Sequence, residues 1–212
     1  RYKQIVREKM EDKLRLINNP RAQLFVGNEY FKVTLFDKMH IAQKVLNSLG
    51  EGVVLAFGDS EVDVAFLSLA PPAGIIYLPH FVGNPTEATG FITHPTLINH
   101  QATYYFWREA LERHKRKEIT LRAVITDVDF CLTPGRGELE RAMAKLIFET
   151  MSLGIPAHLI TGGGLDQGYE HRVINKIKEV ASSSSPVSSQ GYQAIGELRK
   201  LLSSYTYNES RL

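Results

Sequence analysis

The stretch AVITDVDFCLTPG (residues 123–135) runs from apolar residues into two aspartates, one residue apart, and then into a turn. An apolar run that does not alternate with polar residues is typical of a central strand in a parallel sheet, because both faces of such a strand are buried. GVVLAFGDS (residues 52–60), GIIYLPHF (residues 74–81) and PAHLITGGG (residues 156–164) show the same pattern. The sequence therefore predicts four buried parallel strands.

Stretches with helical spacing of apolar residues separate these strands. Helices are predicted at residues 37–50, 97–118, 137–154 and 166–181, with a short one at residues 61–70. Alternation of strands and helices favours an α/β fold with a Rossmann-like parallel sheet and helices on both faces. Ligands bind such sheets outside the carboxyl ends of the strands, so the residues that follow each strand are the candidate site.

Composition narrows the class of protein. The 212 residues are 43% hydrophobic and 23% charged, as in a globular chain, and the net charge of +2 predicts neither a nucleic-acid nor a membrane partner. A single cysteine, Cys131, excludes an internal disulfide framework and favours a reducing, cytoplasmic location. No apolar run approaches the roughly 20 residues of a membrane helix. The chain begins with Arg1, which indicates a fragment, a processed product or the ordered part of a longer protein.

Four aspartates follow two of the predicted strands, namely Asp59, Asp63, Asp127 and Asp129. Carboxylates that face one another repel unless a proton or a cation lies between them, and hard oxygen ligands suit Mg²⁺. An aspartate can also attack phosphorus and form an aspartyl-phosphate. The hydroxyl of Thr161, the glycine amides beside it and a lysine could hold phosphoryl oxygens.

Taken together, these motifs resemble those of the haloacid dehalogenase-like (HAD) phosphatases. DVDFCLT (residues 127–133) is similar to the first motif of that family, and HLITGGG (residues 158–164) to the second. DKMHIAQKVLNSLG (residues 37–50) is similar to the lysine helix, and AFGDSEVDVAFL (residues 56–67) to the Gly-Asp motif that follows it. The resemblance implies a Mg²⁺-dependent hydrolase of phosphomonoesters, acting on a phosphorylated small molecule or a phosphoprotein.

The resemblance also implies a role for each matching residue. Asp127 would be the nucleophile and Asp129 the general acid/base, while Lys38 would neutralise the phosphoryl group. Thr161 and Gly162 would bind that group. The magnesium ligands would be Asp127, the backbone carbonyl of Asp129, Asp59 and, in support, Asp63.

The order of the motifs departs from that of the family, because the lysine helix and the Gly-Asp motif precede the nucleophile. A circular permutation explains this order, since the first and fourth motif strands are neighbours in HAD sheets. A piece of a tandem protein is the alternative. The implied division is a cap-like segment at residues 1–37, with two strands at residues 22–36, a HAD-like core at residues 38–181, and a linker with a final helix at residues 182–212.

Each candidate also has a plainer interpretation. Asp127 and Asp129 could form only a turn, Asp59 and Asp63 could be a helix cap and a solvated helix residue, and Thr161 could belong to a flexible turn. On this view the chain is a non-catalytic member of the fold, such as a scaffold or a subunit of a larger assembly.

Three further positions affect how closely the chain matches the HAD motifs. Lys38 could be a surface lysine, and Lys44 is its rival for the lysine role. Phe130 stands where the family has a small or polar residue, and it could narrow the pocket. Cys131 replaces a common threonine and is expected to be buried packing, because nearby negative charge raises the pKa of a thiol.

Overall fold

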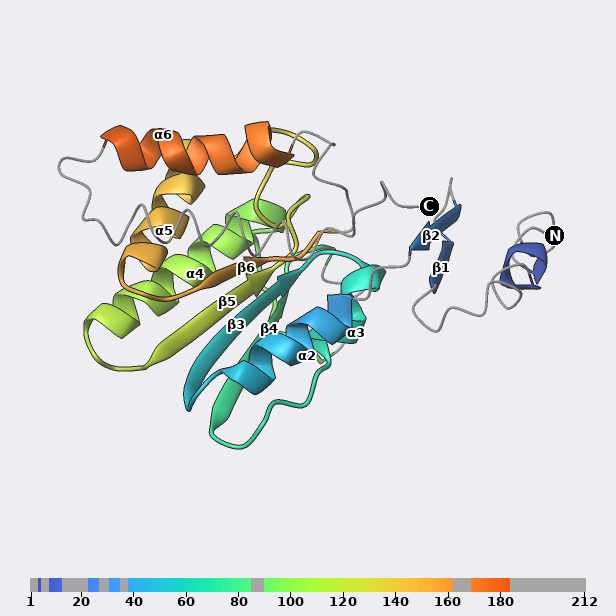
Figure 1. Cartoon of the computed structure of the whole chain (residues 1–212), viewed down its shortest axis with the longest axis horizontal. Coiled ribbons are helices and arrows are strands. Elements are labelled where there is room, and N and C mark those ends of the chain that lie inside the picture. The colour runs from blue at the N-terminus through green and yellow to red at the C-terminus, as the bar shows by residue number, and fades with distance from the viewer. Residues whose placement is uncertain are drawn as a thin grey trace.

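The computed structural model describes residues 4, 8–12, 23–26, 31–34, 38–84, 90–161 and 169–183. The fold is α/β, and its centre is a four-stranded sheet in the order β4-β3-β5-β6 (Figure 1). The strands are β3 (Gly52–Gly58), β4 (Ile75–Phe81), β5 (Leu121–Thr126) and β6 (Ala157–Leu159). Each neighbouring pair is parallel, so the predicted parallel sheet is confirmed. Strand β6 is shorter than the apolar run that predicted it.

Helices connect these strands at the predicted places. They are α2 (Lys38–Ser48), α3 (Val64–Leu67) after the 3₁₀ turn η1 (Glu61–Asp63), α4 (Asn99–Lys115), α5 (Arg141–Ser152), and α6 (Asn175–Ser183) after the π-helical turn η4 (Glu170–Ile174). Two further strands, β1 (Gln23–Val26) and β2 (Phe31–Thr34), form a separate antiparallel pair, as predicted. The predicted final helix, in the C-terminal part of residues 182–212, lies outside the described residues.

Strand β3 shows why the sheet is covered on both faces. Its residues are buried almost throughout, and successive side chains point to opposite faces. Val53, Leu55 and Phe57 pack in one core with α4, α5 and α6, whereas Val54 and Ala56 pack in a second core with α2 and α3. Figure 1 shows these two groups of helices on opposite sides of the sheet. The predicted arrangement of helices on both faces is therefore confirmed.

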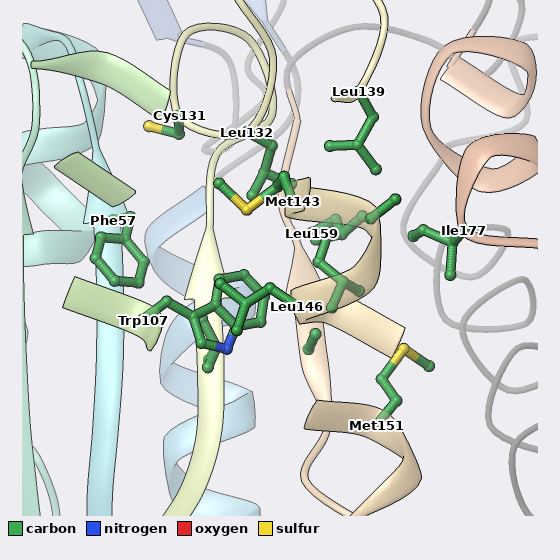
Figure 2. Packing of buried hydrophobic residues seen from close by; sticks show 14 of the residues in the cluster. Phe57, Trp107, Cys131, Leu132, Leu139, Met143, Leu146, Met151, Leu159 and Ile177 are labelled. Atoms are coloured by element: carbon green, nitrogen blue, oxygen red, sulfur yellow. The ribbon is translucent and has the colours of Figure 1, made fainter. Parts of the chain in front are cut away.

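The larger of the two cores is centred on Trp107 of α4. Its ring is fully buried and stacks on Phe57 of β3, with ring centroids 6.3 Å apart. Figure 2 shows both side chains in this cluster together with Leu146 of α5. The indole Nε1 donates a hydrogen bond of 2.9 Å to Thr150 Oγ1, which is also buried. Helices α4 and α5 are thus joined to each other and to the sheet by one side chain.

Among the described helices, none combines the length and the apolar character that crossing a bilayer requires. The division of the chain at residues 37/38 and 181/182 stays a prediction. Helix α6 continues to Ser183, slightly beyond the second of these boundaries.

Candidate active site

The sheet itself brings the two aspartate-bearing segments together. Strands β3 and β5 are parallel neighbours, with Phe57 paired to Thr126 at their carboxyl ends. The amide of Asp127 donates a 3.0 Å hydrogen bond to Phe57 O, so the chain leaves both strands at the same level. Asp59 and Asp127 therefore emerge side by side, as the sequence predicts.

Three carboxylates form a cluster at this edge of the sheet. Asp59, Asp63 and Asp127 each place one ligand atom within 4.8 Å of the others. Asp63 is fully buried and Asp127 is nearly so. Charges this close and this poorly solvated repel strongly, so the cluster requires a cation or a bound proton.

Lys38 supplies one positive charge. It is the first residue of α2, and its Nζ lies 2.6 Å from Asp63 Oδ1 and 2.9 Å from Asp127 Oδ1. Burial favours the neutral amine, but attraction by the carboxylates of Asp127 and Asp63 outweighs it and raises the pKa of Lys38. The ammonium therefore stays charged. Lys44, the rival candidate, is exposed to solvent on the same helix.

Asp63 organises the turn that carries Asp59. Its Oδ2 accepts hydrogen bonds from the backbone amides of Asp59 and Ser60, at 3.1 and 3.2 Å, and from Ser60 Oγ at 2.9 Å. A β-carbon on Gly58 would lie 2.4 Å from the Asp63 β-carbon, so the close approach requires glycine. The plainer interpretation of Asp63 as a solvated helix residue is wrong, because the side chain is enclosed by this turn and by Lys38.

The protonation of the cluster reflects its excess negative charge. Burial first, and then the charges of Asp127 and Asp63, raise the pKa of Asp59 to about 7. Burial also raises the pKa of Asp127, and Asp63 adds to this, although Lys38 acts in the opposite direction. With one ammonium against three carboxylates, the site is suited to take up a further cation near neutral pH.

The donor set fits a hard divalent cation such as Mg²⁺, because three carboxylates supply oxygen ligands. Cys131 adds no competing thiolate. Its sulfur is buried 3.6 Å from Asp59 Oδ1, and burial followed by the charge of Asp59 raises the pKa of this thiol. The expected packing role of Cys131 is consistent with this environment.

Asp129 takes a different position from the other three aspartates. Within the described residues the acidic cluster does not include its carboxyl group, which instead accepts hydrogen bonds from Tyr169 OH at 2.7 Å and from two nitrogens of Arg172 at 3.3 and 3.4 Å. Neither Tyr169 nor Arg172 belongs to a sequence motif. Their contact with Asp129, about 40 residues away along the chain, is set by tertiary packing, which no local pattern encodes.

Thr161 joins the same network. It follows β6, and its Oγ1 donates a 2.9 Å hydrogen bond to Tyr169 OH. Gly162, the other predicted phosphoryl-binding residue, lies outside the described residues. Phe130, next to Asp129, has a backbone φ of 64°, and the residue is 45% exposed. The structure thus brings Lys38, Asp59, Asp63 and Asp127 together, and it links Asp129 to Thr161 through Tyr169.

A cavity also lies away from the acidic cluster. A cavity of about 630 Å³ lies between α4 and α5, and it is lined by residues that include His100, Tyr104, Arg108 and Met143. None of the candidate site residues lines this cavity.

Comparison of the chain with protein-family models, with curated proteins and with solved structures gives no match. Functional inference therefore depends on the acidic cluster and its surroundings.

Proposed function

We propose that this chain is a Mg²⁺-dependent phosphomonoester hydrolase with a HAD-like core, acting through an aspartyl-phosphate on Asp127. One observation carries the proposal. Lys38 contacts both Asp63 and Asp127, and Asp59 lies within 4.8 Å of both aspartates, although these residues come from separate segments of the chain. A nucleophile, a charged lysine and a cation site in one place are the groups that phosphoryl transfer requires.

The substrate is a phosphorylated small molecule or a phosphoprotein. Asp59, Asp63 and Asp127 would hold the Mg²⁺, together with the backbone carbonyl of Asp129. When bound, the cation would neutralise the phosphoryl oxygens and the excess charge of the cluster. Lys38 would remain paired to Asp127 and would orient this carboxylate toward phosphorus.

The reaction divides between two aspartates. An oxygen of Asp127 attacks phosphorus, the bond from phosphorus to the ester oxygen breaks, and the leaving alcohol takes a proton from Asp129. Water then attacks the aspartyl-phosphate and gives a proton to Asp129. The bond from phosphorus to the Asp127 oxygen breaks, and inorganic phosphate leaves. Lys38 and the donors near Thr161 stabilise the negative charge during both steps.

The proposed HAD-like core is circularly permuted. The pairing of β3 with β5 supports this, because these strands carry the candidate fourth and first motifs, which are neighbours in the family. One chain also brings Asp59 and Asp127 together, whereas a fragment of a tandem protein would leave two distant half-sites. The strand pair β1-β2 is consistent with the remnant of a cap.

The test is hydrolysis of an aryl phosphate by the purified chain, with Mg²⁺ and with EDTA. We expect turnover only with Mg²⁺, and a loss of at least about 10³-fold in Asp127→Asn, because an amide is a far weaker nucleophile than a carboxylate. The far-ultraviolet circular dichroism of this variant should match that of the wild type. Full turnover by the variant, or turnover in EDTA, would refute the proposal.

The alternative is a non-catalytic member of the fold. The ion pairs that Lys38 makes with Asp63 and Asp127 favour it, because they compensate part of the charge without any metal. Calorimetry separates the two functions. Absence of Mg²⁺ binding in the wild type, together with no hydrolysis of any phosphomonoester tested, would support the alternative.

A further inference from the structure

We propose that Tyr169 and Arg172 are positioning residues that hold Asp129 as the base for the second step, in which water hydrolyses the aspartyl-phosphate. This inference rests on the proposed hydrolase function. It concerns Arg172 on η4 and Tyr169, the residue that precedes η4, and both lie outside every motif discussed above. The geometry of the Asp129 carboxyl group carries it.

Both oxygens of that carboxyl group are held. Oδ2 accepts from Tyr169 OH at 2.7 Å, and Oδ1 accepts from two nitrogens of Arg172 at 3.3 and 3.4 Å. Two anchored oxygens prevent rotation of the carboxylate plane. Arg172 can only donate and the Tyr169 hydroxyl donates here, so both carboxyl oxygens act as acceptors in these contacts.

The two donors are themselves fixed. Tyr169 is buried, and its hydroxyl accepts a 2.9 Å hydrogen bond from Thr161 Oγ1. The Arg172 guanidinium lies over the Tyr169 ring, 4.7 Å from its centroid, and donates to Gly137 O at 3.1 Å. The amide of Leu139 donates to Arg172 O at 2.9 Å. Asp129 is therefore held by a preorganised pair of residues rather than by mobile surface side chains.

The protonation state of Tyr169 agrees with its role as a donor. Burial raises the pKa of Tyr169, and the hydrogen bond to Asp129 raises it further, against an opposing effect of the Thr161 hydroxyl. The phenol therefore keeps its proton. Asp129 itself is partly open, with 27% of its side chain exposed, so a water molecule can approach it.

A loss of this positioning should slow the second step more than the first. An aryl phosphate has a good leaving group and needs little help from an acid, so formation of the aspartyl-phosphate should persist without a well-placed Asp129. Hydrolysis of the intermediate would become limiting. The kinetic parameters then separate, because kcat/KM reports the first step and kcat reports the second.

The experiment compares Tyr169→Phe and Arg172→Gln with wild type, using an aryl phosphate and Mg²⁺. We expect kcat to fall about tenfold to a hundredfold, as when one hydrogen bond to a charged group is lost. KM should fall in parallel, kcat/KM should stay within about threefold of wild type, and rapid mixing should show a burst of the phenol. Asp129→Asn should show the same burst.

Tyr77→Phe is the matched control, because Tyr77 is a half-buried tyrosine whose hydroxyl donates to Phe66 O at 2.8 Å, away from Asp129. It should leave both kinetic parameters unchanged. Equal losses in kcat and kcat/KM without a burst would show a structural role and overturn the inference, as would unchanged kinetics in both variants. A wild-type chain that hydrolyses no phosphomonoester would instead refute the proposed function itself.

Discussion

At the scale of single residues, the site is defined by more negative charge than its surroundings compensate. Asp59 is the residue that shows this best, because Lys38 makes its ion pairs with the other two carboxylates. Burial and its neighbours raise the pKa of Asp59 from 3.8 to about 7. An ionised Asp59 therefore costs free energy in the folded chain that it does not cost in the unfolded chain.

This difference predicts how stability depends on pH. Between about pH 4 and pH 7 the folded chain binds more protons than the unfolded chain, so the free energy of unfolding should fall as pH rises through this window. Asp59→Asn should flatten the slope and stabilise the chain at pH 8 by on the order of a few kcal/mol. Urea unfolding in EDTA at several pH values measures both quantities. An unchanged slope in the variant would contradict the prediction.

Mg²⁺ bound at Asp59 should stabilise the folded chain, whereas ionisation of Asp59 without a cation destabilises it. A cation that binds only the folded chain stabilises it by about 2.7 kcal/mol at a concentration of 100 times Kd. At pH 8 we expect thermal unfolding of the wild type to shift upward with Mg²⁺, and that of Asp59→Asn to shift much less. An equal shift in both proteins would exclude Asp59 from the ligand set.

At the scale of elements, the end of β3 and the turn η1 form one structural unit. Gly58 permits the approach of Asp63, and Asp63 in turn holds the backbone of Asp59 and Ser60. Gly58→Ala should therefore destabilise the chain by about 1–3 kcal/mol and weaken Mg²⁺ binding as well. Gly50→Ala is the control, since a β-carbon there meets nothing within 4 Å. Unfolding and calorimetry on both variants test whether Gly58 supports both stability and Mg²⁺ binding. Equal effects of Gly58→Ala and Gly50→Ala would disprove this.

The contact between α4 and α5 makes a separate prediction. Thr150→Val would leave the buried Nε1 of Trp107 without its acceptor, at a cost of about 1–3 kcal/mol. Thr150 Oγ1 also donates to Leu146 O, so Ser152→Ala, which removes a similar bond to Phe148 O, is the control. Urea unfolding should separate the two variants. Because these residues lie in the core, Mg²⁺ affinity should not change in either one.

At the scale of the whole molecule, the sheet and the acidic cluster could be predicted from the sequence, whereas the network around Asp129 could not. Continuous apolar runs identify central parallel strands, and the carboxyl ends of such strands meet, so the proximity of Asp59 and Asp127 follows from local patterns. Tyr169 and Arg172 reach Asp129 only through tertiary packing of η4 against the segment around Gly137. No local pattern encodes that contact.

The burial of Asp63 could not be predicted from the sequence either. In the sequence, Asp63 follows Ser60 and Glu61 at the start of a predicted short helix. Polar residues at such a position are typical of a solvated helix start. The burial of Asp63 depends on the missing side chain of Gly58 and on Lys38, which arrives from another segment. The short length of β6 has the same kind of cause, because ladder pairing with β5 and not hydrophobicity sets where a strand ends.

The arrangement of the chain makes a last prediction about assembly. Lys38 and Asp127 approach within 2.9 Å in one chain, so every copy should contain its own complete site. Lys38→Ala and Asp127→Asn should each be inactive, and a mixture of the two, unfolded and refolded together, should stay inactive. If copies exchanged segments, a mixed dimer would pair the intact Lys38 of one copy with the intact Asp127 of the other, and activity would return. Aryl phosphate hydrolysis by the refolded mixture, compared with each variant refolded alone, measures this directly, and any activity above theirs would contradict a site formed within one chain.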